Sequence, residues 1–309
     1  MAKMPKTNMD RPAQRLVNEV YEAAARHKDP FTISVTHSQY RGHYLGMSQI
    51  GKRCDRAIWY GFRGAPRKAT DGRMLQLFNV GDYVEKMQIF WLEQAGYKIT
   101  DRQADYSDLG GFFRGHPDGV IHGVTDLPHA WDAKSTNKKK FDALKTFGMI
   151  KTYPVYCCQA QMMMHYSGTE RAIYTFTCKD NSEWYAERLY YSKFAAQEII
   201  DRAARIIEAN EPPEKPFDID DFNCQWCSHR PICWFEEDAI VNELICGTCH
   251  YCLFPAGTLK PWCANPAHAA EIKTWGIGCP DWIDRFEKSQ PQAGRLPIEK
   301  LGQDSKCSP

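Results

Sequence analysis

The stretch GHPDGVIHGVTDLPHAWDAKSTN, residues 115–137, decides the fold class of this chain. Asp118 lies in a turn-like HPDG, and Asp132 lies behind a tryptophan in a run that alternates like a strand. Because side chains alternate along an extended segment, Asp132 and Lys134 project from one face and Ala133 from the other. Such a pair is either an ordinary surface ion pair or half of a site for metal and phosphate.

The composition is that of an ordinary globular chain. It has 309 residues, 25% charged and 43% hydrophobic, enough for one large domain or for a domain with an appendage. Mean hydropathy is −0.54, and no apolar run is long enough to span a bilayer. The first residues lack the apolar segment of a secretory signal, so we expect a cytoplasmic protein, in a bacterium or in the host cell of a virus. Net charge is +1, so any nucleic-acid binding must come from local basic patches.

Cysteine usage is the unusual feature. Nine of the 13 cysteines come after residue 220, many of them at metal-ligand spacings. In a reducing compartment disulfides do not persist, so metal binding is the better interpretation.

Hydrophobic periodicity predicts an α/β core. Short strands are expected within 97–136. Further elements are expected as helices at 11–27, 72–94, 138–150, 154–167 and 193–209, and as strands at 171–179 and 183–191. Ser48 is expected to cap the helix that carries Cys54. The core-facing stripe of the 72–94 helix is expected to be Val80, Val84, Met87 and Trp91.

Composition divides the chain into four parts. They are an N-terminal helical segment (1–43), the α/β core (44–240), a small cysteine-rich module (241–285) and a disordered tail (286–309).

The acidic residues of the core, with one lysine, suit phosphodiester hydrolysis. Hard cations prefer carboxylate oxygens, polarise a phosphoryl group and lower the pKa of a bound water. A lysine within reach stabilises developing charge or positions the water, and a glutamine can orient either of them. The candidates are Glu85, Asp118, Asp132, Lys134 and Gln159.

In their order and settings, the segments GDYVE, HPDG, WDAK and YCCQAQMMMHYSG resemble the PD-(D/E)XK nuclease superfamily. The likeness covers roughly residues 45–235 and is greatest to the RecB-like and YqaJ-type viral recombination exonucleases, the lambda exonuclease kind. It implies a restriction-endonuclease-like α/β core with a mixed central sheet flanked by helices. It also implies a DNA exonuclease that depends on Mg2+ or Mn2+ and serves phage recombination or repair.

The resemblance also assigns roles to residues. Glu85, Asp118 and Asp132 match metal ligands, and Ala133 matches the position that lends its backbone carbonyl to the metal. Lys134 matches the catalytic lysine, and the glutamine of the last motif is Gln159. A bulkier residue is common at the position of Ala133, but its side chain is expected to face away from the metals.

A first cysteine set, CQWCSHRPIC, contains Cys224, Cys227 and Cys233 and needs a fourth ligand for zinc or for a four-iron cluster. One upstream cysteine with C-x2-C-x5-C behind the core resembles the iron–sulfur nucleases, the AddB type and the four-cysteine CRISPR-adaptation type. By that likeness Cys54 completes a structural [4Fe-4S] site. Zinc remains the alternative.

A second set, Cys246, Cys249, Cys263 and Cys279, has the spacing of a zinc knuckle or short ribbon. Cys252, His250 and His268 are alternative ligands. A segment this small needs a structural metal, so Zn2+ is expected here.

The implied partner is DNA, with a single-strand annealing protein as a second partner. Basic residues interleaved with aromatic ones suit a groove that follows a DNA strand. They are Lys52, Arg53, Arg56, Arg63, Arg67 and Lys68, with Trp59, Tyr60 and Phe62, and the run Lys138, Lys139 and Lys140. Two other functions stay open: a structure-selective endonuclease or CRISPR-adaptation trimming nuclease, and a catalytically silent, metal-stapled DNA-binding protein.

Overall fold

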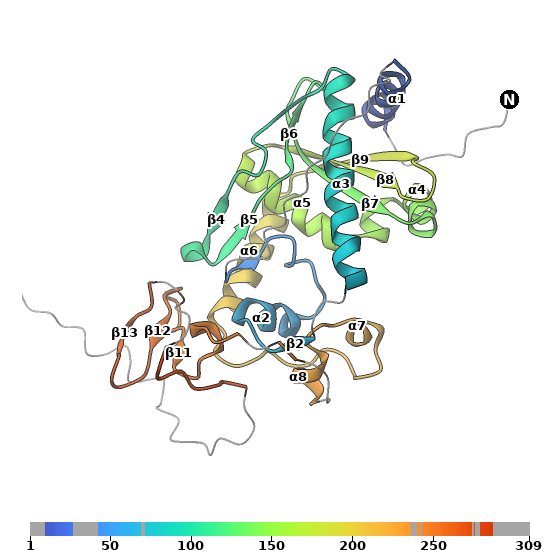
Figure 1. The fold of residues 1–309 in the computed structure, drawn as a ribbon. Helices are drawn as coiled ribbons and strands as arrows, with labels where there is room; N and C mark the ends of the chain where they lie inside the picture. The colour runs from blue at the N-terminus through green and yellow to red at the C-terminus, as the bar shows by residue number, and fades with distance from the viewer. Residues whose placement is uncertain are drawn as a thin grey trace, which may run out of the picture.

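The computed structural model describes residues 10–26, 43–68, 72–235, 240–241, 243–273, 275 and 279–286. Its centre is a five-stranded sheet of order β3-β6-β7-β8-β9 (Figure 1). The strands are β3 (Lys98–Thr100), β6 (Gly119–His122), β7 (His129–Thr136), β8 (Arg171–Cys178) and β9 (Trp184–Tyr190). Strands β7 and β8 run parallel and the other pairs antiparallel, so the sheet is mixed and the fold is α/β.

Helices cover both faces of this sheet. On one face lie α1 (Arg11–Arg26) and α3 (Gly72–Gln94), which bury Leu16, Ile89 and Leu92 against Trp131 of β7. The other face carries α4 (Lys138–Thr152), α5 (Pro154–Ser167) and α6 (Lys193–Glu208) over a larger core. Each face of the sheet is therefore buried, as expected for strands with long apolar runs.

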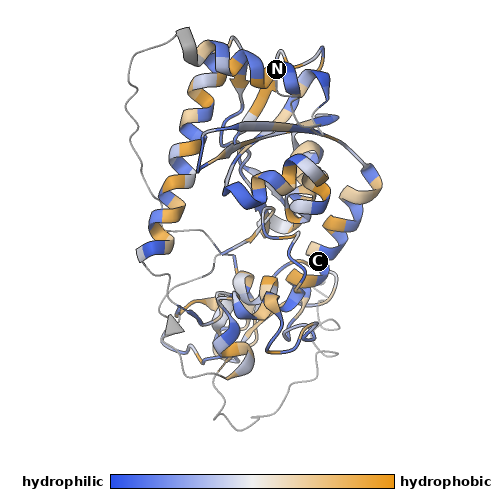
Figure 2. Ribbon diagram, turned by 90° about the vertical axis from the view of Figure 1, so that its right-hand side faces the viewer, coloured by the Kyte–Doolittle hydropathy of each residue, from blue (hydrophilic) through white to orange (hydrophobic). Residues whose placement is uncertain are grey.

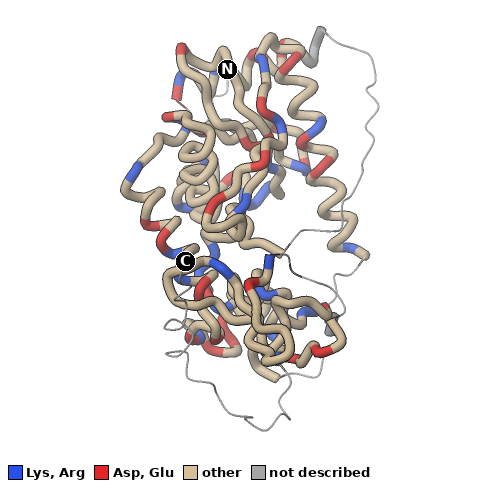
Figure 3. Tube along the Cα trace, turned by 90° about the vertical axis from the view of Figure 1, so that its left-hand side faces the viewer, with Lys and Arg blue, Asp and Glu red and all other residues tan. Residues whose placement is uncertain are grey.

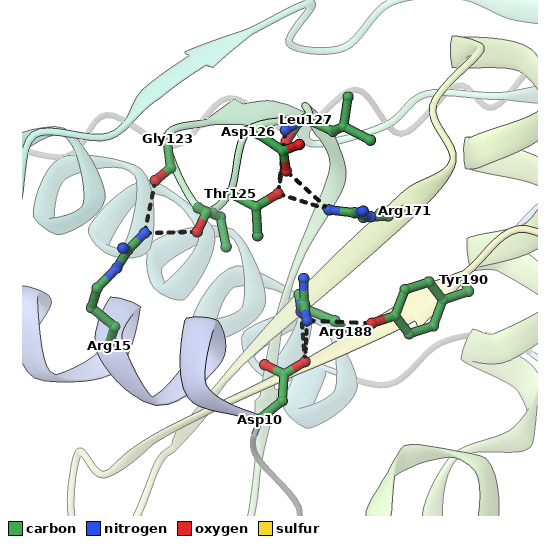
Figure 4. Close-up of polar contacts among 10 residues, drawn as sticks. Asp10, Arg15, Gly123, Thr125, Asp126, Leu127, Arg171, Arg188 and Tyr190 are labelled. Atoms are coloured by element: carbon green, nitrogen blue, oxygen red, sulfur yellow. Dashed lines mark hydrogen bonds and ion pairs between the residues drawn. The ribbon is translucent and has the colours of Figure 1, made fainter.

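Polar contacts fasten α1 to the sheet (Figure 4). Arg188 of β9 pairs with Asp10 at 2.6 Å, at the start of the helix. Arg15 donates to the carbonyls of Gly123 and Val124 at 3.1 and 2.7 Å, in the turn after β6. The N-terminal helix thus packs on the core sheet, and Leu16 has no exposed surface.

A second group of short elements lies at the end of α6 that points away from the main sheet (Figure 1). It contains α2 (Asp55–Arg63), α7 (Phe222–Gln225), α8 (Arg230–Trp234) and η2 (Cys246–Thr248). Its strands are β2 (Arg67–Lys68) paired with β10 (Ile240–Val241), and the three-stranded sheet β11 (Cys252–Leu253), β12 (Trp262–Cys263) and β13 (Ala270–Glu271). Arg202 of α6 joins the two groups through Asp55, at 2.9 Å from its Nε.

A small sheet, order β1-β5-β4, lies beside the main one. It consists of β1 (Leu45–Gly46), β4 (Tyr106–Asp108) and β5 (Phe113–Gly115), with η1 (Leu109–Gly111) between the last two. No helix of the described residues is long and apolar enough to cross a membrane.

The predicted helices and long strands are confirmed, within a few residues of their expected ends. One local prediction, the cap of α2, is wrong. The cap of α2 is Cys54, whose Sγ accepts a hydrogen bond from the Ala57 N–H at 3.4 Å, and Ser48 lies in a preceding turn. The tail beyond residue 286 lies outside the described residues.

The stripe expected along α3 is wrong for Val80, although Trp91 packs against the core. The residues that α3 buries are Gln88, Ile89 and Leu92, whereas Val80 is 39% exposed. Apolar and polar residues alternate along the whole helix, so its composition does not single out one face (Figure 2). Only the C-terminal half of α3 reaches the sheet, and the contacts of Gln88 determine which face it presents.

Candidate active site

Strands β6 and β7 bring two of the candidate carboxylates together. Gly119 pairs with Trp131 across the antiparallel ladder, so Asp118 lies at the end of β6 beside the middle of β7. The Ala133 N–H donates a 2.8 Å hydrogen bond to Asp118 Oδ2. The turn at HPDG therefore delivers the Asp118 carboxylate to the strand that carries Asp132.

Asp132 is the most enclosed of these carboxylates, with 3% of its side chain exposed. Its Oδ1 contacts the Lys134 ammonium, and its Oδ2 accepts a 2.6 Å hydrogen bond from Gln159 Nε2 of α5. The predicted same-face arrangement of Asp132 and Lys134 is confirmed. At this burial the two residues are not a solvated surface pair.

Lys134 lies against two tyrosine rings. Its Nζ is 5.1 Å from the ring centre of Tyr156 and 5.8 Å from that of Tyr174, close enough for cation–π attraction. The Tyr174 hydroxyl is buried near Asp132 without meeting hydrogen-bond geometry. These rings limit the directions in which the ammonium can point.

Gln88 fixes α3 on the sheet. Its Nε2 donates to the Lys134 carbonyl at 3.1 Å and to Thr177 Oγ1 at 2.9 Å. Glu85 lies one turn earlier, and its Oε1 accepts from Gln103 Nε2 at 3.4 Å. The helix thus places a third carboxylate near Asp132 and Lys134, at electrostatic range.

Burial and mutual repulsion dominate the electrostatics here. Burial raises the pKa of Asp118 well above its usual range, and the neighbouring Asp132 carboxylate raises it further. The pKa of Glu85 is also raised by burial and then by Asp132. Burial opposes the charged form of Lys134, but the carboxylates of Asp132 and Asp118 more than offset it, so its pKa is raised.

The site has the charge and donor atoms that suit divalent cations. Three carboxyl groups face one ammonium in a largely enclosed place, so ionisation of all three is costly without a counterion. Carboxylate and carbonyl oxygens are the ligands that Mg2+ prefers. Glu85, Asp118 and Asp132 would hold it, and the Ala133 carbonyl belongs to the same strand.

The structure also gathers the first cysteine set. Cys54, Cys224, Cys227 and Cys233 line one cavity together with Tyr60, His229 and Trp234. Burial raises the pKa of Cys54, and the thiols of Cys227 and Cys233 act on it from nearby. Cys54 from the start of α2 therefore meets cysteines more than a hundred residues later, as the sequence predicted.

The second cysteine set is less uniform. Cys252 pairs with Cys263 across β11 and β12, and both Cys246 and Cys249 lie close enough to act on the Cys252 thiol. Cys279 instead lies near two other residues. Its Sγ, a ring nitrogen of His268 and a carboxylate oxygen of Asp281 all lie within 4.8 Å of one another.

Among the described residues, no other three ligand-type side chains are that close together. Neither three carboxylates of the candidate active site nor three thiols of the first cysteine set are therefore that close together. Burial raises the pKa of Cys54 and of Cys227.

The aromatic residues of α2 and Arg63 do not line the expected DNA groove, whereas Lys52, Arg53, Arg67 and Lys68 are exposed. Trp59, Tyr60 and Phe62 are at most 3% exposed and Arg63 is fully buried. Arg63 donates instead to the Ala209 carbonyl at 2.8 Å, so neither it nor the rings can reach a DNA strand. Basic and acidic positions are mixed along the described chain (Figure 3).

Three residues of the site, Gln88, Tyr174 and Tyr156, could not be assigned a role from the sequence. Gln88 and Tyr174 act through contacts between α3, β7 and β8, which depend on the pairing of Asp132 with Tyr174 in the parallel ladder. Tyr156 lies in the YCCQ segment, three residues before Gln159. A tyrosine one helical turn from a site residue was the one available signal.

Comparisons with known proteins give a distant likeness. No family model matches the chain, and no curated protein matches it. An alkaline exonuclease from Laribacter hongkongensis, LHK-Exo, is similar over 54% of this chain and 87% of its own, at 15% identity and a TM-score of 0.40. LHK-Exo in complex with dAMP gives 13% identity over 53% and 86%, with a TM-score of 0.37. SSO0001 gives 15% identity over 71% and 94%, with a TM-score of 0.41. Similarity this distant carries no conclusion about activity.

Proposed function

We propose that this protein is a metal-dependent DNA exonuclease of phage or prophage recombination or repair. The observation that carries the proposal is the buried convergence of Glu85, Asp118 and Asp132 on Lys134, with Gln159 held on Asp132. A purely structural cluster gains little from three carboxyl groups that cannot all ionise without a counterion, whereas a metal site requires them.

The residues of the site have different roles in the proposed hydrolysis. Bound Mg2+ or Mn2+ supplies charge neutralisation at the phosphate and a water of lowered pKa. Asp118, Asp132 and Glu85 would hold the cations. Lys134 places its ammonium where charge develops on the phosphate, and Gln159 keeps the Asp132 carboxylate in a fixed orientation.

A [4Fe-4S] cluster on Cys54, Cys224, Cys227 and Cys233 is part of the proposal, in a structural role. Support comes from the cavity that the four cysteines line together. A cluster there would tie α2 to the end of the core.

The experiment uses anaerobically purified protein with end-labelled linear DNA and with closed circular DNA, each with magnesium or manganese. Mononucleotide or ladder products from linear DNA alone, lost in EDTA, are expected. Cutting of circular DNA would replace the proposal with a structure-selective endonuclease. DNA binding without cleavage in either metal would leave a silent binding protein.

A further inference from the structure

The C-terminal module, residues 245–286, is too small to hold itself together by packing. Each strand of its sheet, β11, β12 and β13, has two residues. Its buried apolar residues are few, with Ile245 and Phe254 the largest. Segments of this size are usually stabilised by a disulfide or a metal, and Cys249, Cys252, Cys263 and Cys279 form no disulfide in the structure.

Residues 279–286, here called the strap, fasten this module to the rest of the protein. Trp282 Nε1 donates to the Ile245 carbonyl at 3.1 Å. Arg285 Nη1 donates to the Asn210 carbonyl at 2.7 Å, and the ring of Phe286 packs edge-on against Trp59 at 6.1 Å. A contact that holds the start of the strap in place would therefore also stabilise the packing of the module against the core.

The start of the strap contains Cys279 and Asp281, which lie close to His268. The Nε2 of His268 contacts Oδ2 of Asp281, and the sulfur of Cys279 completes the group. Each half is positioned by its own turn. The His268 N–H donates to the Asn265 carbonyl at 2.9 Å, and the Trp282 N–H donates to the Cys279 carbonyl at 3.1 Å.

We propose that His268, Cys279 and Asp281 bind a zinc ion that anchors the strap to the module. A thiolate, an imidazole and a carboxylate together suit zinc, whereas calcium and magnesium require oxygen ligands. All three residues are exposed, which leaves a fourth position for water. The zinc would connect the turn after β12 with the strap.

This ligand set differs from the four-cysteine set predicted from spacing. Both sets contain Cys279, but only the mixed set has its three ligand atoms within 4.8 Å of one another. The inference is independent of the proposed nuclease activity, because these residues belong to other elements than the carboxylate site.

The first measurement is zinc per chain in the full-length protein, prepared anaerobically with reductant. We expect His268→Ala and Asp281→Ala each to lose one zinc equivalent relative to the wild type, or to bind it at least about tenfold more weakly. Cys263→Ser is the matched control, since it removes a cysteine of the other set, and it should keep this zinc. Far-UV circular dichroism checks that the variants fold.

The second measurement replaces zinc by cobalt(II). The charge-transfer absorption of cobalt–thiolate bonds grows with the number of thiolates, so the mixed set predicts the intensity of one thiolate. Cys279→Ser should abolish this band. Trypsin should cleave the chain after Arg285 faster in His268→Ala than in the wild type, because the strap is released.

Two results would overturn the proposal. If Cys263→Ser abolishes zinc binding and His268→Ala does not, the metal belongs to the four cysteines. If the wild type binds no zinc that depends on Cys279, the group is an exposed ion pair beside a thiol.

Discussion

Gln159 Nε2 lies 2.6 Å from Asp132 Oδ2, across the boundary between a helix and the central strand of the sheet. Lys134 contacts the other oxygen of the same carboxylate. Both oxygens of Asp132 are therefore engaged in the metal-free protein. A cation that binds Asp132 must share or replace one of these contacts. It competes with Lys134, because the ammonium and the cation are both positively charged.

Gln159→Ala should lower kcat about 10- to 100-fold and change KM for DNA little, because the side chain orients a metal ligand and does not hold substrate. Steady-state kinetics on linear DNA measures both constants. Gln161→Ala, on the same helix, is the control. An unchanged kcat would remove Gln159 from the site.

Lys134→Ala should reduce cleavage about 10²- to 10⁴-fold, the range of a positioned acid–base or charge-stabilising group. The same change should tighten metal binding, because the ammonium no longer competes for Asp132. Isothermal titration with Mn2+ measures the affinity. Lys151→Ala, on an exposed position of α4, is the control and should change neither quantity. Weaker Mn2+ binding by Lys134→Ala would contradict the competition.

Asp118→Asn should abolish activity and stabilise the metal-free protein. A carboxyl with a raised folded-state pKa destabilises the fold increasingly as pH rises from its unfolded value through its folded value. Asparagine removes that cost and can still accept from the Ala133 N–H. At pH 7.5 in EDTA we expect a gain of about 1 kcal/mol or more in the free energy of unfolding. Urea denaturation measures it, and a loss of stability would show that the carboxylate is compensated.

Part of the fold could be predicted because its elements are long and periodic. The helices α1, α5 and α6 and the strands β8 and β9 follow their patterns closely. The sheet β1-β5-β4 has two- and three-residue strands from distant segments, which leave no periodic signal. The burial of Arg63 also depends on tertiary contacts. An arginine is expected at the surface, but this one donates to the carbonyls of Cys252, in the C-terminal module, and Ala209.

The order of motifs indicated the site, but its supporting contacts could not be predicted. Asp118, Asp132 and Lys134 were inferred from local patterns, and strand alternation gave the common face of Asp132 and Lys134 correctly. The contact of Tyr174 with Lys134 depends on which strand pairs with β7 and in what register. A single sequence does not encode that pairing locally.

Acid should destabilise the protein through His129, whose side chain is fully buried in β7. Burial, followed by the Arg188 charge, lowers its pKa from 6.5 to about 4. The contribution of neutral His129 to the free energy of unfolding is fully present above pH 6.5. It is lost as the pH falls toward 4, because the unfolded chain binds the proton more readily than the folded one. The full loss is about 3 kcal/mol. Urea denaturation of wild type and His129→Leu at pH 7, 6 and 5 should show their difference shifting by about 1 kcal/mol per pH unit below 6.5. A constant difference would show that His129 is not protonated on unfolding.

Cys54→Ser should weaken the first metal site and loosen the fold together, because this ligand alone comes from before the core. If the site holds a four-iron cluster, anaerobically purified wild-type protein is brown, with a broad visible absorption that dithionite bleaches. The serine variant should lose most of its iron and unfold at a lower temperature by several degrees. Cys158→Ser, a half-buried thiol on α5 that does not line the cavity, is the control and should retain iron. A colourless wild-type protein with zinc in place of iron would assign this site to zinc and leave the exonuclease proposal standing, since hydrolysis of a phosphodiester requires no electron transfer.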